Sequence, residues 1–158
     1  MSSEQNKKAE GVKGSKKARA SAARLAAVQS IYAIDVGELS ASHVIDDVLV
    51  RRQGQMLEDE EMVTPDGLLY KKIVNGVQQQ RENLFEITEP SCPRLKAGSL
   101  EPLLASIILA GSYELLAHED IDAPIIINEY INVTHAFYAG QEAKMVNGVL
   151  DAIGKLLR

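Results

Sequence analysis

The side chains that most often carry catalysis or hold metals are few in this chain and poorly spaced. Three histidines, His43, His118 and His135, and one cysteine, Cys92, stand at no metal-ligand spacing from one another. Neither a GxGxxG loop nor a P-loop occurs. No carboxylate is paired in the sequence with a base or nucleophile. The sequence therefore predicts a protein that is no enzyme and has neither a metal site nor a cofactor.

Cationic side chains offer the clearer chemistry, because they gather at one end. Residues 1–24 hold seven basic and two acidic residues, a net charge of +5, whereas the rest holds ten basic and twenty acidic residues, a net charge of −10. A basic end on an acidic body is typical of chains that neutralise nucleic-acid phosphates. Charge alone also fits a solvated tail that aids solubility.

The bulk sequence favours one helical domain in a reducing compartment. A length of 158 residues suits a single domain, and aromatic residues are scarce, which favours aliphatic helix packing over a sheet. Residues 1–14 carry little to bury, so we expect a disordered basic tail there and one all-helical domain over 15–158. A lone cysteine and the absence of a long apolar run predict a cytoplasmic protein without a membrane segment.

Apolar spacings of three and four residues recur along the domain and predict helices. The first begins near Ser15 and ends at Gly37. The second is capped by Ser40 or Ser42, and residues 51–63, with their acidic run, are expected to form an exposed loop. Further helices are expected from Thr64-Pro65-Asp66, from Pro102, from Pro124 and after Gly140, with Thr64 as the cap of the first of these.

The tetrapeptide VNGV occurs twice, at 74–77 and 146–149. Asn-Gly is a strong hairpin signal, but a hairpin needs alternating apolar residues on both sides. The period around both copies is three to four, which predicts helix interiors. Because a glycine inside a helix costs about 1 kcal/mol relative to alanine, we expect Gly76 and Gly148 to permit close helix approach.

Four stretches resemble the NusB family in order and spacing: RLAAVQSIY at 24–32, YELL at 113–116, INEYINVTHAF at 127–137 and KMVNGVLDAI at 144–153. The resemblance covers roughly residues 16–158. It implies an all-α fold of about seven helices in two packed sub-bundles. It also implies a transcription antitermination factor that binds boxA, a single-stranded segment of nascent ribosomal RNA, together with a small ribosomal-subunit protein acting as NusE. The pair would join an antitermination complex on RNA polymerase.

The resemblance implies RNA contacts from the basic N-terminal segment, the first helix and the start of the last helix. The residues carried over on this basis are Lys16, Lys17, Arg19, Arg24, Tyr32, Gln141, Lys144 and Met145. The cations would neutralise phosphates, and Tyr32 would stack on a base or contact the partner protein. Each of two residues has a competing interpretation: Tyr32 could be a core residue, and Lys144 could be a solvated surface lysine. We expect Asn128 and Glu129 to brace helix packing.

The chain departs from the family where RNA contacts are expected. Alanines and a serine stand at 20–23 in place of an arginine cluster, Met145 replaces a frequent phenylalanine, and LLASIIL at 103–109 lacks arginines. Affinity for RNA follows the number of phosphates neutralised. We therefore predict weaker, more partner-dependent RNA binding than in a more basic relative.

Two alternatives stay open at this stage. An acidic helical adaptor that binds proteins, with weakened RNA binding, would fit the lost arginines, and a homodimer would hide apolar helix faces. We also expect residues 1–23 to contribute little to the core, so that their removal would leave the fold intact.

Overall fold

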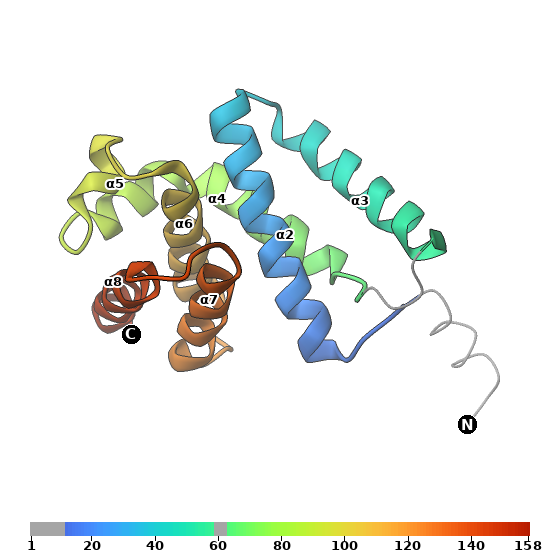
Figure 1. Cartoon of the computed structure of the whole chain (residues 1–158). Helices are drawn as coiled ribbons and strands as arrows, with labels where there is room; N and C mark the ends of the chain where they lie inside the picture. Colours follow the sequence, from blue (N-terminus) through green and yellow to red (C-terminus); the bar gives the residue numbers. More distant parts are fainter. Residues whose placement is uncertain (1–11, 59–62) are drawn as a thin grey trace.

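The computed structural model describes residues 12–58 and 63–158, with only the backbone given for 52–58. The regular structure of these residues is helical throughout, without a strand, as predicted (Figure 1). The helices are α2 (Lys16–Gly37), α3 (Ala41–Glu58), α4 (Gly67–Thr88), α5 (Pro93–Ala97), α6 (Pro102–Ala117), α7 (Ala123–Phe137) and α8 (Glu142–Leu157). Most of the predicted disordered tail, residues 1–11, lies outside the described residues.

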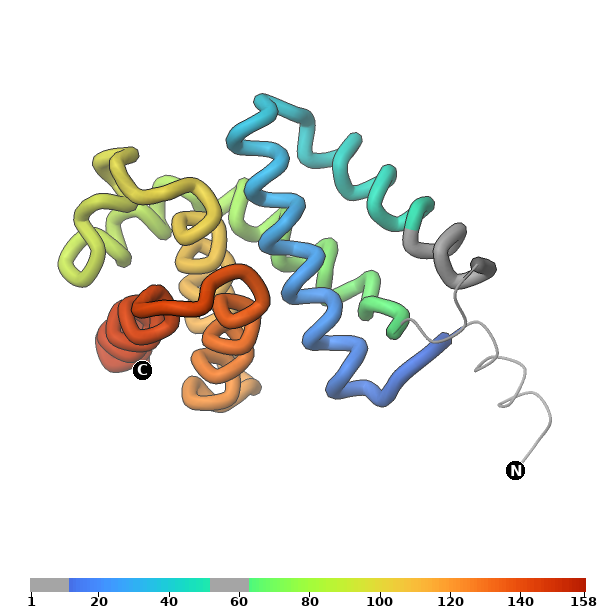
Figure 2. Tube along the Cα trace, in the orientation of Figure 1, coloured from blue at the N-terminus to red at the C-terminus, as the bar shows by residue number. Residues whose placement is uncertain are grey.

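The helices pack as two groups joined at α6, which confirms the predicted pair of sub-bundles. Helices α2, α3 and α4 contact one another, and so do α6, α7 and α8. Both α2 and α4 also pack against α6, and α2 contacts α7. Figure 2 shows α2 crossing between α3 and the C-terminal group, so that residues of α2 can reach both halves. The short α5, which was not predicted from the sequence, packs on α4.

Helix α6 forms the centre of the core because it is apolar on nearly every side. Ten of its residues are buried, among them Ile107, Ile108 and Leu109. A helix that is apolar all round must be enclosed by other helices. The LLASIIL stretch, which departs from the family, is thus core and not an exposed surface.

Side-chain caps explain the starts of α2 and α4, with one difference from the sequence prediction. Ser15 caps α2, since its hydroxyl accepts a hydrogen bond from the Ala18 amide at 3.1 Å. Asp66, and not Thr64, caps α4 by accepting from the Leu69 amide at 3.1 Å. Helix α2 ends at Gly37, as predicted, and the residue that follows, Glu38, is left-handed with φ of 53°.

The expected loop at 51–63 is wrong in its first half. Helix α3 continues through this stretch to Glu58, and residues 59–62 lie outside the described residues. Charged residues are good helix formers, and nothing between 51 and 58 is a proline. An acidic composition predicts exposure but does not by itself end a helix.

Both VNGV copies lie inside helices, α4 and α8, as the apolar period predicts. The expected close approach holds for only one of them. A Cβ on Gly76 would stand 2.0 Å from Cζ of Tyr113, so the glycine makes room for that ring. A Cβ on Gly148 would meet no atom within 4 Å. The prediction that Gly148 permits close packing within the chain is therefore wrong.

Candidate RNA-binding surface

The start of α2 is fastened to the segment that leads into α4. The Lys13 amide donates to Oγ1 of Thr64 at 2.9 Å, and the Thr64 amide donates to the Lys13 carbonyl at 2.9 Å. The Asp66 amide donates to the Arg19 carbonyl at 3.0 Å. These bonds hold residues 13–19 in place, and they give Thr64 a pairing role in place of the predicted cap.

The predicted phosphate ligands of this segment differ in their availability. Lys16 and Lys17 are exposed in the first turn of α2. Arg19 is only half-exposed, and its Nε donates to the Thr64 carbonyl at 3.1 Å. Part of the Arg19 guanidinium is therefore already committed, whereas both lysines are accessible to an anionic ligand.

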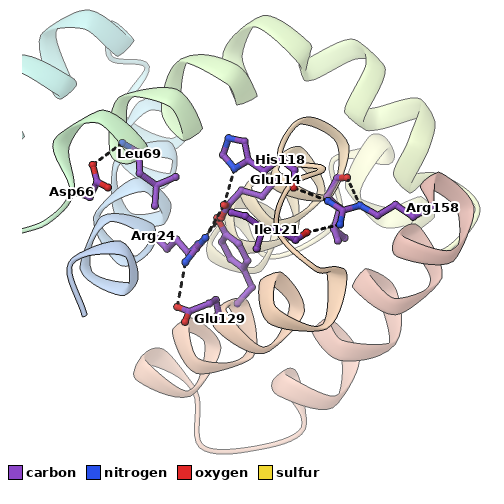
Figure 3. Close-up of polar contacts among 10 residues, drawn as sticks. Arg24, Asp66, Leu69, Glu114, His118, Ile121, Glu129 and Arg158 are labelled. Carbon is purple, nitrogen blue, oxygen red and sulfur yellow. Dashed lines mark hydrogen bonds and ion pairs between the residues drawn. The ribbon is translucent and has the colours of Figure 1, made fainter. Parts of the chain in front are cut away.

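Arg24 does not belong to this exposed set, and the prediction that it contacts RNA is corrected by its burial. The residue is 5% exposed. Its Nε and Nη2 donate to the two carboxylate oxygens of Glu114, at 2.7 and 3.0 Å, and its Nη1 lies 3.7 Å from Glu129 (Figure 3). Planar guanidinium and carboxylate groups form such two-pronged pairs readily. Arg24 thus joins α2 to α6 and α7.

Glu114 is the centre of this buried network. It also accepts hydrogen bonds from the Tyr130 hydroxyl and from Nδ1 of His118, the latter at 2.9 Å. Burial would raise the pKa of Glu114, but the bonds from His118 and Arg24, and the charge of Arg24, lower it to about 2. Burial also opposes the charge of Arg24, yet its bond and attraction to Glu114 raise the pKa of Arg24 overall. The pair is therefore ionised at neutral pH.

Glu129 braces the same junction, as its place in the INE motif suggested. It is buried and accepts a hydrogen bond from the Ser21 hydroxyl at 2.8 Å. Ser21 thus donates to the network from α2. The sequence could not identify this network, because its members are separated by up to 108 residues.

Tyr32 lies on the surface, which removes its core interpretation. Its side chain is 38% exposed. Sixteen residues separate it from Lys16 on the same helix, which is about 24 Å at 1.5 Å per residue. The predicted contacts on α2 therefore fall into two patches, with cations at the beginning of the helix and an aromatic ring near its end.

The predicted contacts of α8 stand at its first turn. Gln141 and Lys144 are exposed, and the Lys144 amide donates to the Gln141 carbonyl at 3.1 Å. Met145 is half-buried and packs against the core, so only part of it can face a ligand. The exposure of Lys144 is compatible with both the predicted phosphate contact and the competing interpretation of a solvated lysine.

Two residues that sequence reasoning missed also lie at this end of the molecule. The Tyr138 hydroxyl, in the turn after α7, donates to the carboxylate of Glu101, just before α6. Their separation of 37 residues left no local signal.

Over the described residues, no group of three His, Cys, Asp or Glu side chains could hold a metal ion. None of the helices described is long and apolar enough to cross a bilayer.

Comparison with known proteins identifies relatives over nearly the whole chain. The model of the NusB family matches residues 21–155. The chain is 39% identical over 146 residues to the transcription antitermination protein NusB of Novosphingobium aromaticivorans, covering 90% of this chain and 96% of that protein. It is 34% identical over 138 residues to the protein of the same name from Rhizobium rhizogenes, covering 87% and 86%.

Solved structures show the same fold. The structure of T. maritima NusB aligns with a TM-score of 0.70 at 19% identity, covering 85% of this chain and 89% of that one. The solution structure of NusB from Aquifex aeolicus aligns with a TM-score of 0.68 at 18% identity, covering 87% and 88%. At these identities the likeness extends to the fold alone.

Proposed function

Since the chain belongs to the NusB family, we propose that it acts as a transcription antitermination factor that binds boxA-type single-stranded RNA together with a small ribosomal-subunit protein. The family is one of transcription antitermination proteins and not of enzymes, as the sequence predicted. The ribosomal protein acting as NusE, and an antitermination complex on RNA polymerase, are the proposed partners. A cytoplasmic location follows from that role and stays a prediction.

One observation carries the RNA part of this proposal. Lys16 and Lys17 are exposed on a segment whose backbone is fastened at Thr64. Cations held in place lose less freedom when they meet phosphates than cations on a loose tail. Tyr32, near the other end of α2, and Lys144, in the first turn of α8, are exposed and would contact the same strand further along.

The burial of Arg24 supports the predicted modest affinity. Without Arg24, the described residues of the predicted set offer Lys16, Lys17, Arg19 and Lys144 as phosphate ligands. Each phosphate neutralised in a single strand contributes about 0.7 to the slope of log affinity against log salt. Four contacts predict a slope near −3, and a slope steeper than about −4 would contradict the predicted set.

The test is a salt titration of binding to fluorescently labelled boxA-type RNA, with and without the ribosomal protein. The variant Lys16→Ala/Lys17→Ala is expected to flatten the slope by about 1.4. Lys96→Ala/Lys155→Ala is the matched control, since it removes two exposed lysines that already pair with carboxylates, Glu86 on α4 and Asp151 on α8. Equal slopes for the two variants would refute the role of the N-terminal cations.

Point substitutions are preferable to truncation, because the expectation that residues 1–23 contribute little to the core is wrong. Ala23 is fully buried, and Lys13, Ser15 and Arg19 fasten or cap the start of α2. Removal of the segment would therefore disturb the fold as well as the cations.

The alternative of a protein adaptor with weakened RNA binding is favoured by one feature, the two carboxylates near Tyr138. Glu101 and Glu142 both act on Tyr138 and would repel phosphate there. A pull-down with the ribosomal protein, with and without RNA, separates the two functions. If the protein partner binds and RNA neither joins nor strengthens the complex, the adaptor function replaces the proposed one. The homodimer stays a proposal, and a measurement of the molecular mass in solution would test it.

A further inference from the structure

Two side chains from distant parts of the chain meet at the start of α6: Tyr138, in the turn between α7 and α8, and Glu101, the residue before α6. Tyr32 of α2 lies near enough to Tyr138 to act on the pKa of its hydroxyl. In Figure 2 this turn passes in front of α6 on its way to α8, and the bond from Tyr138 to Glu101 ties the turn to the start of α6.

The Tyr138 ring is held at both ends. Its hydroxyl donates to the Glu101 carboxylate, and its ring packs half-buried against the core. Burial, the bond and charge of Glu101, and the nearby Glu142 and Tyr32 all raise the pKa of the Tyr138 hydroxyl. The phenol therefore stays neutral, and Tyr32 lies near enough for its own charge to act on Tyr138.

The charges around these rings decide what the surface can accept. Glu101 and Glu142 disfavour a phosphate, whereas the exposed ring of Tyr32 and the open part of the half-buried Tyr138 ring offer stacking surface to an unpaired base. Lys144 of the predicted set is exposed in the first turn of α8, six residues after Tyr138, and can take the phosphate that links such bases. The surface thus suits the bases of a single strand more than its backbone.

We propose that Tyr138 stacks on an unpaired RNA base beside Tyr32, and that Glu101 is a positioning residue that fixes the Tyr138 ring. This inference rests on the proposed RNA-binding function and adds to it a residue, Tyr138, that the family motifs do not supply. The cations at the start of α2 then bind phosphates, and the two tyrosines bind bases.

The test measures the affinity and salt slope of Tyr138→Ala for labelled boxA-type RNA. Loss of one base–aromatic stack corresponds to about a five- to 140-fold drop in affinity. The salt slope is expected to stay unchanged, because no cation is removed. Tyr138→Phe keeps the ring and is expected to bind within about threefold of the wild type.

The matched control is Tyr113→Ala, which removes another half-buried tyrosine at the far end of α6, eleven residues beyond Pro102, or about 16 Å. It is expected to bind RNA as the wild type does once its melting temperature shows a folded protein. In Glu101→Gln the side-chain amide oxygen can still accept a hydrogen bond from the Tyr138 hydroxyl, so this variant is expected to keep the RNA affinity of the wild type. Glu101→Ala is expected to lower affinity about threefold despite the loss of a negative charge, since it frees the ring.

Photocrosslinking with RNA that carries 5-iodouridine gives a readout on the unaltered protein. Crosslinks to Tyr32 and Tyr138 are expected. If the wild type binds RNA tightly and Tyr138→Ala binds it with the same affinity, this inference alone is overturned. The same holds if the wild type binds tightly and neither tyrosine forms a crosslink. A wild-type chain that binds no boxA-type RNA, even with the ribosomal protein, would overturn the proposed function first.

Discussion

Replacement of Arg24 by methionine separates a structural role from an RNA contact at this residue. The guanidinium makes two hydrogen bonds, of 2.7 and 3.0 Å, to Glu114, and the two side chains are 6% and 0% exposed. Removal of Arg24 leaves the buried Glu114 carboxylate without its guanidinium partner, with hydrogen bonds from Tyr130 and His118 alone. We expect the free energy of unfolding of Arg24→Met to fall by about 3–5 kcal/mol, a large part of the total stability of a domain of this size.

The assay is urea denaturation followed by far-UV circular dichroism, beside RNA affinity under folding conditions. Arg81→Ala is the matched control, because Arg81 makes a similar two-pronged pair with Asp35 that is 26% and 30% exposed. Partly exposed pairs contribute about 0–1 kcal/mol. The double variant Arg24→Met/Glu114→Gln should regain at least about 1 kcal/mol over Arg24→Met, since the orphaned charge is gone.

The opposite result would refute this reasoning. If Arg24→Met lost less than about 1 kcal/mol of unfolding free energy, the buried pair would have little effect. If RNA affinity of the folded variant then fell more than tenfold with a flatter salt slope, Arg24 would be an RNA ligand, as the resemblance implied.

Three further changes test other parts of the structure. Gly76→Ala places a methyl group against the Tyr113 ring and should lower the free energy of unfolding by about 1–3 kcal/mol. In Gly148→Ala the methyl group meets open space, and the free energy of unfolding should rise by up to about 1 kcal/mol. Equal effects of the two variants in urea denaturation would contradict the packing at Gly76. The pKa of Glu114 is lowered from 4.5 to about 2 in the folded chain, so the stability that its carboxylate contributes is complete above pH 4.5 and is lost as the pH falls toward 2. The contribution to the free energy of unfolding is about 3 kcal/mol at most. In acid titrations of Glu114→Gln this loss should be absent. Arg158→Ala removes hydrogen bonds to the carbonyls of Leu115, in the last turn of α6, and of His118 and Ile121, which follow α6. We expect it to lower the free energy of unfolding by about 2 kcal/mol, seen as a lower melting temperature. Arg158→Lys should restore only part of this loss, because a lysine cannot reach all three carbonyls.

The sequence alone predicted the helices because their causes are local. Apolar residues three and four apart lie on one face of a helix, so the spacing around both VNGV copies was enough to exclude hairpins. Prolines at 102 and 124 mark first turns where a missing amide costs little. The motifs from RLAAVQSIY to VNGVLD also identified the family, since their order along the chain needs no coordinates.

The tertiary structure decided which predicted site residues can reach a ligand. Arg24 and Lys16 are alike in charge and lie on one helix, yet Arg24 is buried against Glu114, ninety residues away, and Lys16 is exposed. The pairing of Tyr138 with Glu101 likewise depends on how α6 and the turn after α7 pack together. Side-chain partners across such distances follow from the packing of helices against one another, and spacing along the sequence carries no record of that packing.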